Sequence, residues 1–282
     1  MTRNRKANNR KALAQNFLKN PSYVRYLISL SNISEQDRVL EIGSGNGIIT
    51  LELAKVARTV TTLEIDPQLA QAMREKAETL DNVTVKQVSV LRYRLPSKAY
   101  KVFANIPFNI TAEIVEKLLG SPFAPSHAWL LMQKESAEKL AIQSGSTEAS
   151  ALWQPWYKFD VVAEIGRNRF QPIPSVDAAL LQIAKRAKPK LAPDLRGEYA
   201  QFVSYGFRAW RKDLKTAYKS VFTYNQWKRL AKDARFAANA KPSDLTLAQW
   251  LHLFNYFHVG VAPEKKAQLF GKKQSTKHQG RS

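Results

Sequence analysis

The sequence predicts an α/β domain, built on a mostly parallel sheet with helices on both faces, followed by a smaller helical domain. Over residues 39–140, short apolar runs alternate with segments of helical periodicity, which is typical of parallel strands joined by helices. The strand-like runs 159–165 and 176–184 are close enough in sequence to pair antiparallel. Residues 198–260 have the pattern of a mainly helical segment.

The expected elements of the α/β domain follow one another in a regular order. Asn20-Pro21-Ser22 is a helix start signal, because Asn is a favoured cap and Pro fits the first helical turn. Each later helix should return the chain to the next parallel strand by a right-handed crossover. The polar segment 143–150 is expected to be a loop. The expected strands are 39–42, 60–65, 83–88, 101–105 and 128–132, and the helices are 48–56, 67–80, 111–119 and one that begins at Lys134.

Length and composition indicate two domains and two tails. A chain of 282 residues can hold one large core and a smaller satellite domain. A stretch that contains Pro189 and Pro193 is the best boundary between them. We expect a basic disordered tail at 1–12, the α/β domain at 13–186, a linker at 187–197, the helical domain at 198–260 and a second basic disordered tail at 261–282.

The net charge of +21 is concentrated in particular parts of the chain. Residues 31–130 contain 11 Lys and Arg against 11 Asp and Glu, whereas residues 185–241 contain 15 against 4. The first eleven residues add five basic side chains and no acidic one. A neutral block joined to basic segments predicts a catalytic domain that its neighbours carry to a nucleic acid. An anionic membrane is a poorer partner, because no basic amphipathic anchor accompanies a lipidation signal.

The residue types that the chain lacks narrow the possible functions. The absence of cysteine excludes disulfides, thiolate catalysis and Cys-based zinc sites. The four histidines show no metal-ligand spacing with nearby carboxylates, so we expect no metal. No apolar run is long enough to span a bilayer, and the N-terminus lacks the apolar region of a secretory signal. We therefore expect a soluble, cytoplasmic protein.

Residues 41–47, Glu-Ile-Gly-Ser-Gly-Asn-Gly, form a glycine-rich turn between a predicted strand and a predicted helix. Glycines such as Gly43 let the backbone approach a ligand closely at the carboxyl edge of a parallel sheet. Glu64 ends the next strand and can accept both ribose hydroxyls of a nucleoside. Dinucleotide-binding domains use similar residues. Glu41 would repel a pyrophosphate but suits an ammonium group, which favours S-adenosylmethionine as the ligand.

Asn105-Ile106-Pro107-Phe108 follows the last residues of another predicted strand. An exocyclic amine on a nucleobase is a poor nucleophile, so it must be oriented by hydrogen-bond acceptors and held against a flat apolar surface. The Asn105 oxygen and a backbone carbonyl can accept from the amine, Pro107 keeps the turn rigid, and Phe108 can stack on the base. Alone, these four residues also suit an ordinary strand-end turn. Their position on the same sheet edge as the glycine-rich turn favours a methyltransferase.

Basic side chains recur at helical spacing near residue 212. Arg208, Lys212, Lys215 and Lys219 would share one face of a single helix over 207–222, opposite an apolar stripe. Like charges four residues apart destabilise a helix, and contact with phosphates would relieve that repulsion. A solvated surface helix is the alternative. The RNA-binding residues predicted in this segment are Arg208, Arg211, Lys212, Lys215 and Lys219.

Several motifs, in order along nearly the whole chain, resemble the rRNA adenine N(6)-dimethyltransferase superfamily. The resemblance implies a Rossmann-like class I methyltransferase fold with a mostly parallel seven-stranded sheet. Within the superfamily, Ile106 and Phe108 resemble the Erm branch, which is associated with macrolide, lincosamide and streptogramin B resistance. The motifs are Gln15-Asn16-Phe17-Leu18, the turn at 41–47, Leu63-Glu64-Ile65-Asp66, Asn105–Phe108 with Asn109, Leu130-Leu131-Met132-Gln133, and residues 170–177.

The resemblance implies how the methyl donor is held. Asn16 and Leu18 would lie over S-adenosylmethionine, Gly43 would contact it, and Glu64 would bind its ribose. Ser89 departs from the pattern, because the family usually has an Asp at this spacing that accepts from the donor's adenine amine. A neutral hydroxyl accepts more weakly than a carboxylate, so we predict weaker donor binding rather than loss of activity.

The resemblance also implies how the target base is held. Asn105 would contact both the donor and the target amine, and the Pro107 region would supply the second acceptor. Phe108 and Phe170 would stack on opposite faces of a flipped adenine. The alternative for Phe170 is a core residue before a strand.

The first hypothesis is therefore an Erm-type enzyme that methylates an adenine of 23S rRNA, as a monomer, before the subunit is fully assembled. A second is a small-subunit 16S rRNA adenine dimethyltransferase of ribosome assembly. A third is a non-catalytic nucleic-acid-binding factor on the same fold, which only Ser89 favours. Intact Gly43, Glu64 and Asn105 argue against the third hypothesis, because a binding protein would not need them together.

Overall fold

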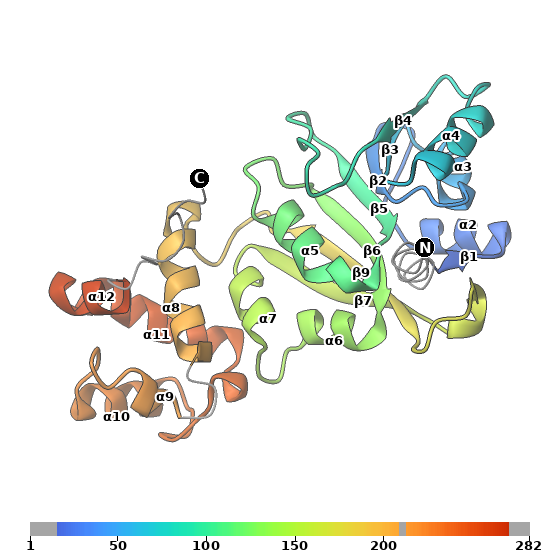
Figure 1. The fold of residues 1–282 in the computed structure, drawn as a ribbon. Coiled ribbons are helices and arrows are strands. Elements are labelled where there is room, and N and C mark those ends of the chain that lie inside the picture. The colour runs from blue at the N-terminus through green and yellow to red at the C-terminus, as the bar shows by residue number, and fades with distance from the viewer. Residues whose placement is uncertain (1–15, 209–212, 271–282) are drawn as a thin grey trace, which may run out of the picture. The chain divides into compact units, whose positions relative to one another are not determined.

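The computed structural model describes residues 16–208 and 213–270 (Figure 1). The chain divides into two compact units. The described part of the first unit covers 16–141 and 157–186, and that of the second covers 142–156, 187–208 and 213–270. The predicted basic tail at 1–12 lies outside the described residues. Arg211 and Lys212, two of the predicted RNA-binding residues, also lie outside them.

The first unit is built on a seven-stranded sheet in the order β4-β3-β2-β5-β6-β9-β7. The first five strands of this order are parallel, and β9 is antiparallel to both of its neighbours. This confirms the predicted fold class. The strands are β2 Arg38–Ile42, β3 Thr59–Glu64, β4 Val83–Gln87, β5 Lys101–Asn105, β6 His127–Gln133, β7 Tyr157–Ile165 and β9 Ala178–Lys185.

Helices cover both faces of this sheet, as the burial of its central strands shows. Val102, Phe103 and Ala104 are consecutive residues of β5 that point to alternate faces, and all three are fully buried. Asn20 caps the first helix, because its Oδ1 accepts from the backbone N–H groups of Ser22 and Tyr23. The helical segments of the unit are α2 Pro21–Ser29, α3 Ile48–Leu53, α4 Pro67–Lys76, η1 Phe108–Ile110, α5 Thr111–Leu119, α6 Lys134–Ala141 and η2 Arg167–Arg169.

A second, two-stranded sheet joins the N-terminal segment to the connection after β7. β1 (Phe17–Leu18) pairs antiparallel with β8 (Phe170–Gln171), with Leu18 opposite Phe170. The side chains of both residues lie in the hydrophobic core of the unit. This pairing holds the segment that carries Asn16 against the rest of the fold.

The second unit is helical and has an aromatic core. Tyr199, Phe202, Trp250, Phe254 and Phe257 are fully buried and contact one another through their rings. In the part of the chain that the structure describes, no helix is both long and apolar enough to cross a membrane. The helical segments are α7 Glu148–Trp153, η3 Pro193–Leu195, α8 Arg196–Arg208, α9 Leu214–Ala217, α10 Tyr224–Asp233, η4 Pro242–Asp244, α11 Leu247–Gly260 and α12 Pro263–Phe270.

Two segments differ from the prediction near the boundaries of the units. Residues 142–156, expected within a continuous α/β domain, pack with the second unit. The expected loop at 143–150 contains the start of α7, because Thr147 and Ser150 form a reciprocal capping box. The expected tail at 261–282 begins with helix α12, whose Lys266 lies 3.9 Å from Glu198.

The predicted single helix over 207–222 is wrong. α8 is described as far as Arg208, and α9 begins after Asp213. The extended Asp213 caps α9, because its carboxylate accepts from the backbone N–H of Thr216 at 2.7 Å. Arg208, Lys215 and Lys219 are exposed, but they do not share one helical face. The helical spacing of the basic residues therefore predicted one continuous helix, although Asp213 caps a new helix within the segment.

Candidate active site

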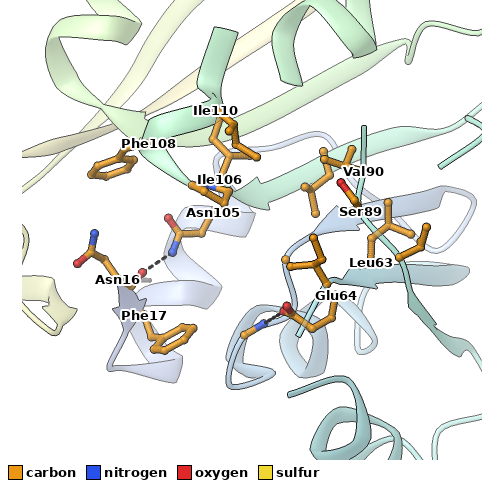
Figure 2. A pocket seen from close by; sticks show the side chains of 16 residues that line it. Asn16, Phe17, Leu63, Glu64, Ser89, Val90, Asn105, Ile106, Phe108 and Ile110 are labelled. Carbon is orange, nitrogen blue, oxygen red and sulfur yellow. Dashed lines mark hydrogen bonds between the residues drawn. The ribbon is translucent and has the colours of Figure 1, made fainter. Parts of the chain in front are cut away.

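A pocket lies at the carboxyl edge of the parallel strands, where β2, β3 and β5 end (Figure 2). Such an edge is where open α/β sheets bind ligands. Asn16, Asn105 and Phe108 lie on one side of the view in Figure 2, and Leu63, Glu64 and Ser89 lie on the other. The lining residues are Asn16, Phe17, Ile42, Gly43, Gly45, Leu63, Glu64, Ile65, Val88, Ser89, Val90, Asn105, Ile106, Pro107, Phe108 and Ile110.

The glycine-rich turn after β2 forms part of the pocket wall. Gly43 and Gly45 have φ angles of +79° and +52°, a region that favours glycine. The ring of Phe17 packs against Gly45 so closely that a Cβ there would lie 2.4 Å from Phe17 Cε1. Phe17 had no predicted role, and its place in the Asn16–Leu18 motif was the available signal.

Glu64 is held in place by the backbone around it. Its side chain is 4% exposed. Oε2 accepts from the N–H of Gly45 and Oε1 accepts from the N–H of Asp66, both at 2.9 Å. Oε2 also accepts from Ser44 Oγ at 3.4 Å, whereas Oε1 has room for a further hydrogen bond. The carboxylate can therefore receive ribose hydroxyls while it keeps the glycine-rich turn in shape.

Apolar side chains surround Ser89 on the same side of the pocket. Ile65 is 63% exposed, although it is a large apolar residue, and it lines the pocket together with Val88 and Val90. Ser89 Oγ accepts from the N–H of Leu91 at 3.3 Å. An exposed apolar wall beside a polar group suits a nucleobase. Together with the carboxylate of Glu64 and the open glycine turn, these residues fit S-adenosylmethionine.

Asn105 occupies the opposite side of the pocket in a defined orientation. Its Nδ2 donates to the backbone carbonyl of Asn16 at 2.6 Å. This contact fixes which end of the side-chain amide is the donor, so Oδ1 remains an acceptor. Ile106 anchors the turn, since it is 2% exposed and its N–H donates to Leu131 at 3.1 Å. Phe108 packs against the core and lines the pocket.

Glu41 does not have the predicted position. Its side chain is fully buried, and Oε2 accepts from Thr50 Oγ1 at 2.5 Å. Burial, opposed by hydrogen bonding and reinforced by the charge of Glu64, raises the pKa of Glu41 to about 7. Successive strand residues face opposite ways, so Ile42 lines the pocket and Glu41 does not. The interpretation that Glu41 would meet an ammonium group is wrong.

Leu18 and Phe170 are also away from the pocket surface. Their side chains are 1% and 0% exposed, and neither lines the pocket. The ladder between β1 and β8 turns both side chains into the core. In this structure Phe170 cannot stack on a base in the pocket, and the alternative of a core position describes it correctly.

The pocket contains little acid–base chemistry. Among the described residues that line it, Glu64 alone has a titratable side chain. Over 16–208 and 213–270, no three His, Cys, Asp or Glu side chains are grouped so that they could hold a metal ion. What the site offers is orientation, through fixed hydrogen-bond acceptors next to apolar surfaces.

Comparison with known proteins gives relatives that cover most of the chain. A family model described as ribosomal RNA adenine dimethylase matches residues 6–258. The chain is 30% identical over 262 residues to Ribosomal RNA small subunit methyltransferase A of Acaryochloris marina, covering 88% of this chain and 97% of that protein. It is 31% identical over 255 residues to the mycinamicin-resistance protein MyrB of Micromonospora griseorubida, covering 90% and 81%.

The solved structure of another rRNA methyltransferase superposes on most of the chain. The crystal structure of 23S rRNA methyltransferase ErmE matches with a TM-score of 0.77 at 27% identity, covering 86% of this chain and all of that one. Relatives named for the small subunit and for drug resistance have similar identity, so they establish the family and not its Erm branch. The chain belongs to the ribosomal RNA adenine dimethylase family and is an S-adenosylmethionine-dependent rRNA adenine methyltransferase.

Proposed function

We propose that this enzyme methylates the exocyclic amine of a flipped adenine in 23S rRNA and thereby confers macrolide, lincosamide and streptogramin B resistance. It acts in the cytoplasm, as a monomer, on RNA that is not yet fully assembled into the subunit. The observation that carries methyl transfer to an amine is the fixed amide of Asn105, which presents an acceptor beside the pocket.

Residues on the Glu64 side of the pocket hold the donor. Glu64 accepts from the ribose hydroxyls, Gly43 allows close approach of the backbone, and Ser89 accepts from the adenine amine. Bound S-adenosylmethionine supplies a methyl group that is transferred by direct displacement at its sulfonium. Asn16 contacts the donor from the N-terminal segment, which is tied down by β1.

Residues of the Asn105 turn hold the target adenine. Asn105 Oδ1 and the backbone carbonyl in the Pro107 region accept from the amine and direct its lone pair at the methyl group. Phe108 stacks on one face of the base. No side chain that lines the pocket has to act as a general base, because the proton leaves to solvent after the methyl group has been transferred.

Cations of the second unit hold the RNA. Arg208, Lys215 and Lys219 are exposed, and contact with phosphates releases counterions from the RNA. Arg211 and Lys212, which lie outside the described residues, complete the set that we propose.

Two residues and two relatives support 23S rRNA as the substrate. Ile106 and Phe108 are the residues that resemble the Erm branch, whereas small-subunit enzymes usually have Leu and Tyr there. MyrB is named for mycinamicin resistance and ErmE for 23S rRNA. The alternative is a 16S rRNA dimethyltransferase, which the relatives named for the small subunit favour.

A tritium-transfer assay separates these two substrates. The protein is incubated with labelled S-adenosylmethionine and, in parallel, naked 23S rRNA, naked 16S rRNA and assembled subunits of each size. We expect label in naked 23S rRNA and little in assembled subunits. Label in small-subunit RNA alone would establish the alternative, and no label in any RNA would overturn both.

A further inference from the structure

Helix α10 presents a basic face to solvent and is anchored by the opposite face. Trp227 and Leu230 are buried, and Trp227 Nε1 donates to Ala238 at 2.8 Å. Lys228 and Lys232 are exposed, one helical turn apart. No acidic residue in the described part of the chain pairs with either lysine, whereas Arg229 has Asp233 at 3.6 Å. Because like charges at this spacing repel, the pair of lysines destabilises the isolated helix.

Tyr224, the first residue of α10, stands beside these lysines. Its position is fixed by Thr223, which forms a capping box with Gln226. The side chain is 65% exposed, in contrast to the buried aromatic core of this unit. Lys215 of α9 places its Nζ 4.8 Å from the centre of the Tyr224 ring. An exposed ring, a cation over it and two further lysines therefore belong to one small region built from α9 and α10.

These features together match single-stranded RNA better than other polyanions. Phosphates would neutralise the lysines, and an unpaired base would cover a flat ring that otherwise remains in water. An acidic peptide would need the lysines but not the ring. An anionic membrane surface would call for several exposed apolar side chains on the helix, and the exposed residues of α10 are otherwise polar or charged.

We propose that Tyr224, Lys228 and Lys232, together with Lys215 of the cation set described above, form an RNA-binding platform remote in sequence from the catalytic motifs. The Tyr224 ring stacks on an unpaired base of the substrate RNA, and the lysines contact adjoining phosphates. This inference rests on the proposed function only in that RNA is the substrate, and it holds for either ribosomal RNA.

Filter binding with the full-length protein tests the platform. The probes are naked 23S rRNA, naked 16S rRNA and a single-stranded 30-nucleotide RNA, each over a range of salt concentrations. Tyr224→Ser should weaken binding to the single strand about 5- to 150-fold, the range for loss of one stacked base. Tyr224→Phe, which keeps the ring, should bind within about twofold of the wild type.

The lysines are tested by a double substitution with a matched control. Lys228→Gln with Lys232→Gln should reduce the slope of log K against log salt by about 1.4, as expected for two lost contacts to single-stranded phosphates. The control is Lys55→Gln with Lys139→Gln, two exposed lysines of the first unit that pair with Glu52 and Glu135. The control should leave the slope unchanged, and an equal reduction in both double variants would overturn the platform.

Failure of the RNA-binding platform can be told apart from failure of 23S rRNA as the substrate. Binding to vesicles of phosphatidylglycerol is measured in parallel. Wild-type RNA binding by Tyr224→Ser, or a loss of binding that is limited to the vesicles, would overturn the platform even if 23S rRNA is methylated. Label transfer to 16S rRNA alone would overturn the proposed substrate while the binding comparison stands. In the transfer assay, Tyr224→Ser should raise KM for RNA and leave kcat unchanged, because Tyr224 is not among the residues that line the pocket.

Discussion

The side-chain amide of Asn105 donates a hydrogen bond to the main-chain carbonyl of Asn16, 2.6 Å away. Asn16 precedes the short strand β1, whose next residue, Phe17, packs on Gly45 of the glycine-rich turn. One N-terminal segment therefore contacts both the Asn105–Phe108 turn and the glycine-rich turn. This arrangement sets the direction of the Asn105 acceptor relative to the donor pocket.

Replacement of Asn105 should separate catalysis from RNA binding. Asn105→Ala removes both the Oδ1 acceptor and the contact to Asn16, so the amine loses its orientation. We expect methyl transfer to fall by about 100-fold or more, the scale of a misplaced reacting group. RNA affinity, measured by filter binding, should be unchanged. Near-normal turnover by this variant would contradict the orientation mechanism.

Substitution at Gly45 should disturb the donor site through Phe17. Gly45→Ala introduces a Cβ 2.4 Å from Phe17 Cε1 at a φ of +52°. The backbone conformation alone costs about 1–2 kcal/mol for an L-residue. We expect a lower melting temperature and weaker binding of S-adenosylmethionine by calorimetry. Adding Phe17→Ala should restore part of the lost stability, because it removes the steric conflict.

Gly197→Ala is the matched control for that substitution. Gly197 lies in α8 of the second unit, and a Cβ there would meet nothing within 4 Å. Alanine in a helix is favoured over glycine by about 0.5–1 kcal/mol, so this variant should be as stable as the wild type or more stable. If both variants lower the melting temperature equally, the account of Gly45 is incorrect.

A carboxylate at position 89 should strengthen donor binding. Ser89 lines the pocket, and its hydroxyl already accepts from the N–H of Leu91. Ser89→Asp keeps an acceptor for that N–H and adds a charged one for the donor's adenine amine. We expect a lower dissociation constant for S-adenosylmethionine. Ser97→Asp, an exposed change on the same connection outside this pocket, should have no effect. An unchanged constant for Ser89→Asp would refute the role assigned to Ser89.

Glu41 should make the first unit more stable at low pH than at high pH. Burial raises the pKa of Glu41 from 4.5 to about 7, so between these values the folded protein keeps a proton that the unfolded chain releases. The contribution of Glu41 is full below pH 4.5 and is lost as pH rises through 7. The shift corresponds to about 3 kcal/mol.

Urea unfolding of the wild type and of Glu41→Gln measures this contribution. The amide is neutral at every pH, so the wild type should lose stability relative to the variant between pH 5 and pH 8. The difference between the two proteins isolates Glu41 from the other carboxyl groups, whose titration affects both alike. A difference that does not change with pH would show that the Glu41 carboxyl is not held protonated.

Local sequence was enough to place the strands of the seven-stranded sheet and several of the residues that line the pocket. The strand 101–105 was predicted at its observed bounds, because its centre, Val102–Ala104, is the apolar run expected of a buried parallel strand. Gly43, Glu64 and Asn105 come together because the carboxyl ends of parallel strands meet at one edge. The positions of these strands and of the turns that follow them along the chain thus follow from short-range patterns.

The features that were missed depend on pairing or on weak local signals. Phe170 is buried because its strand pairs with the strand that contains Leu18, far away in the sequence. A local sequence pattern does not reveal such a pairing. Glu41 points away from the pocket because side chains alternate along a strand and Ile42, its neighbour, lines the pocket. Thr147 and Asp213 are the N-cap residues of α7 and α9. The polar composition of 143–150 and the spacing of basic residues over 207–222 led instead to a predicted loop and a predicted single helix.

The most direct test of the central claim is mass spectrometry of nucleosides from 23S rRNA that has been incubated with the protein and S-adenosylmethionine. The account predicts methyl groups on the exocyclic amine of an adenine in the wild-type reaction and none above background with Asn105→Ala. A methyl group on a ring atom, or equal methylation by Asn105→Ala, would contradict it.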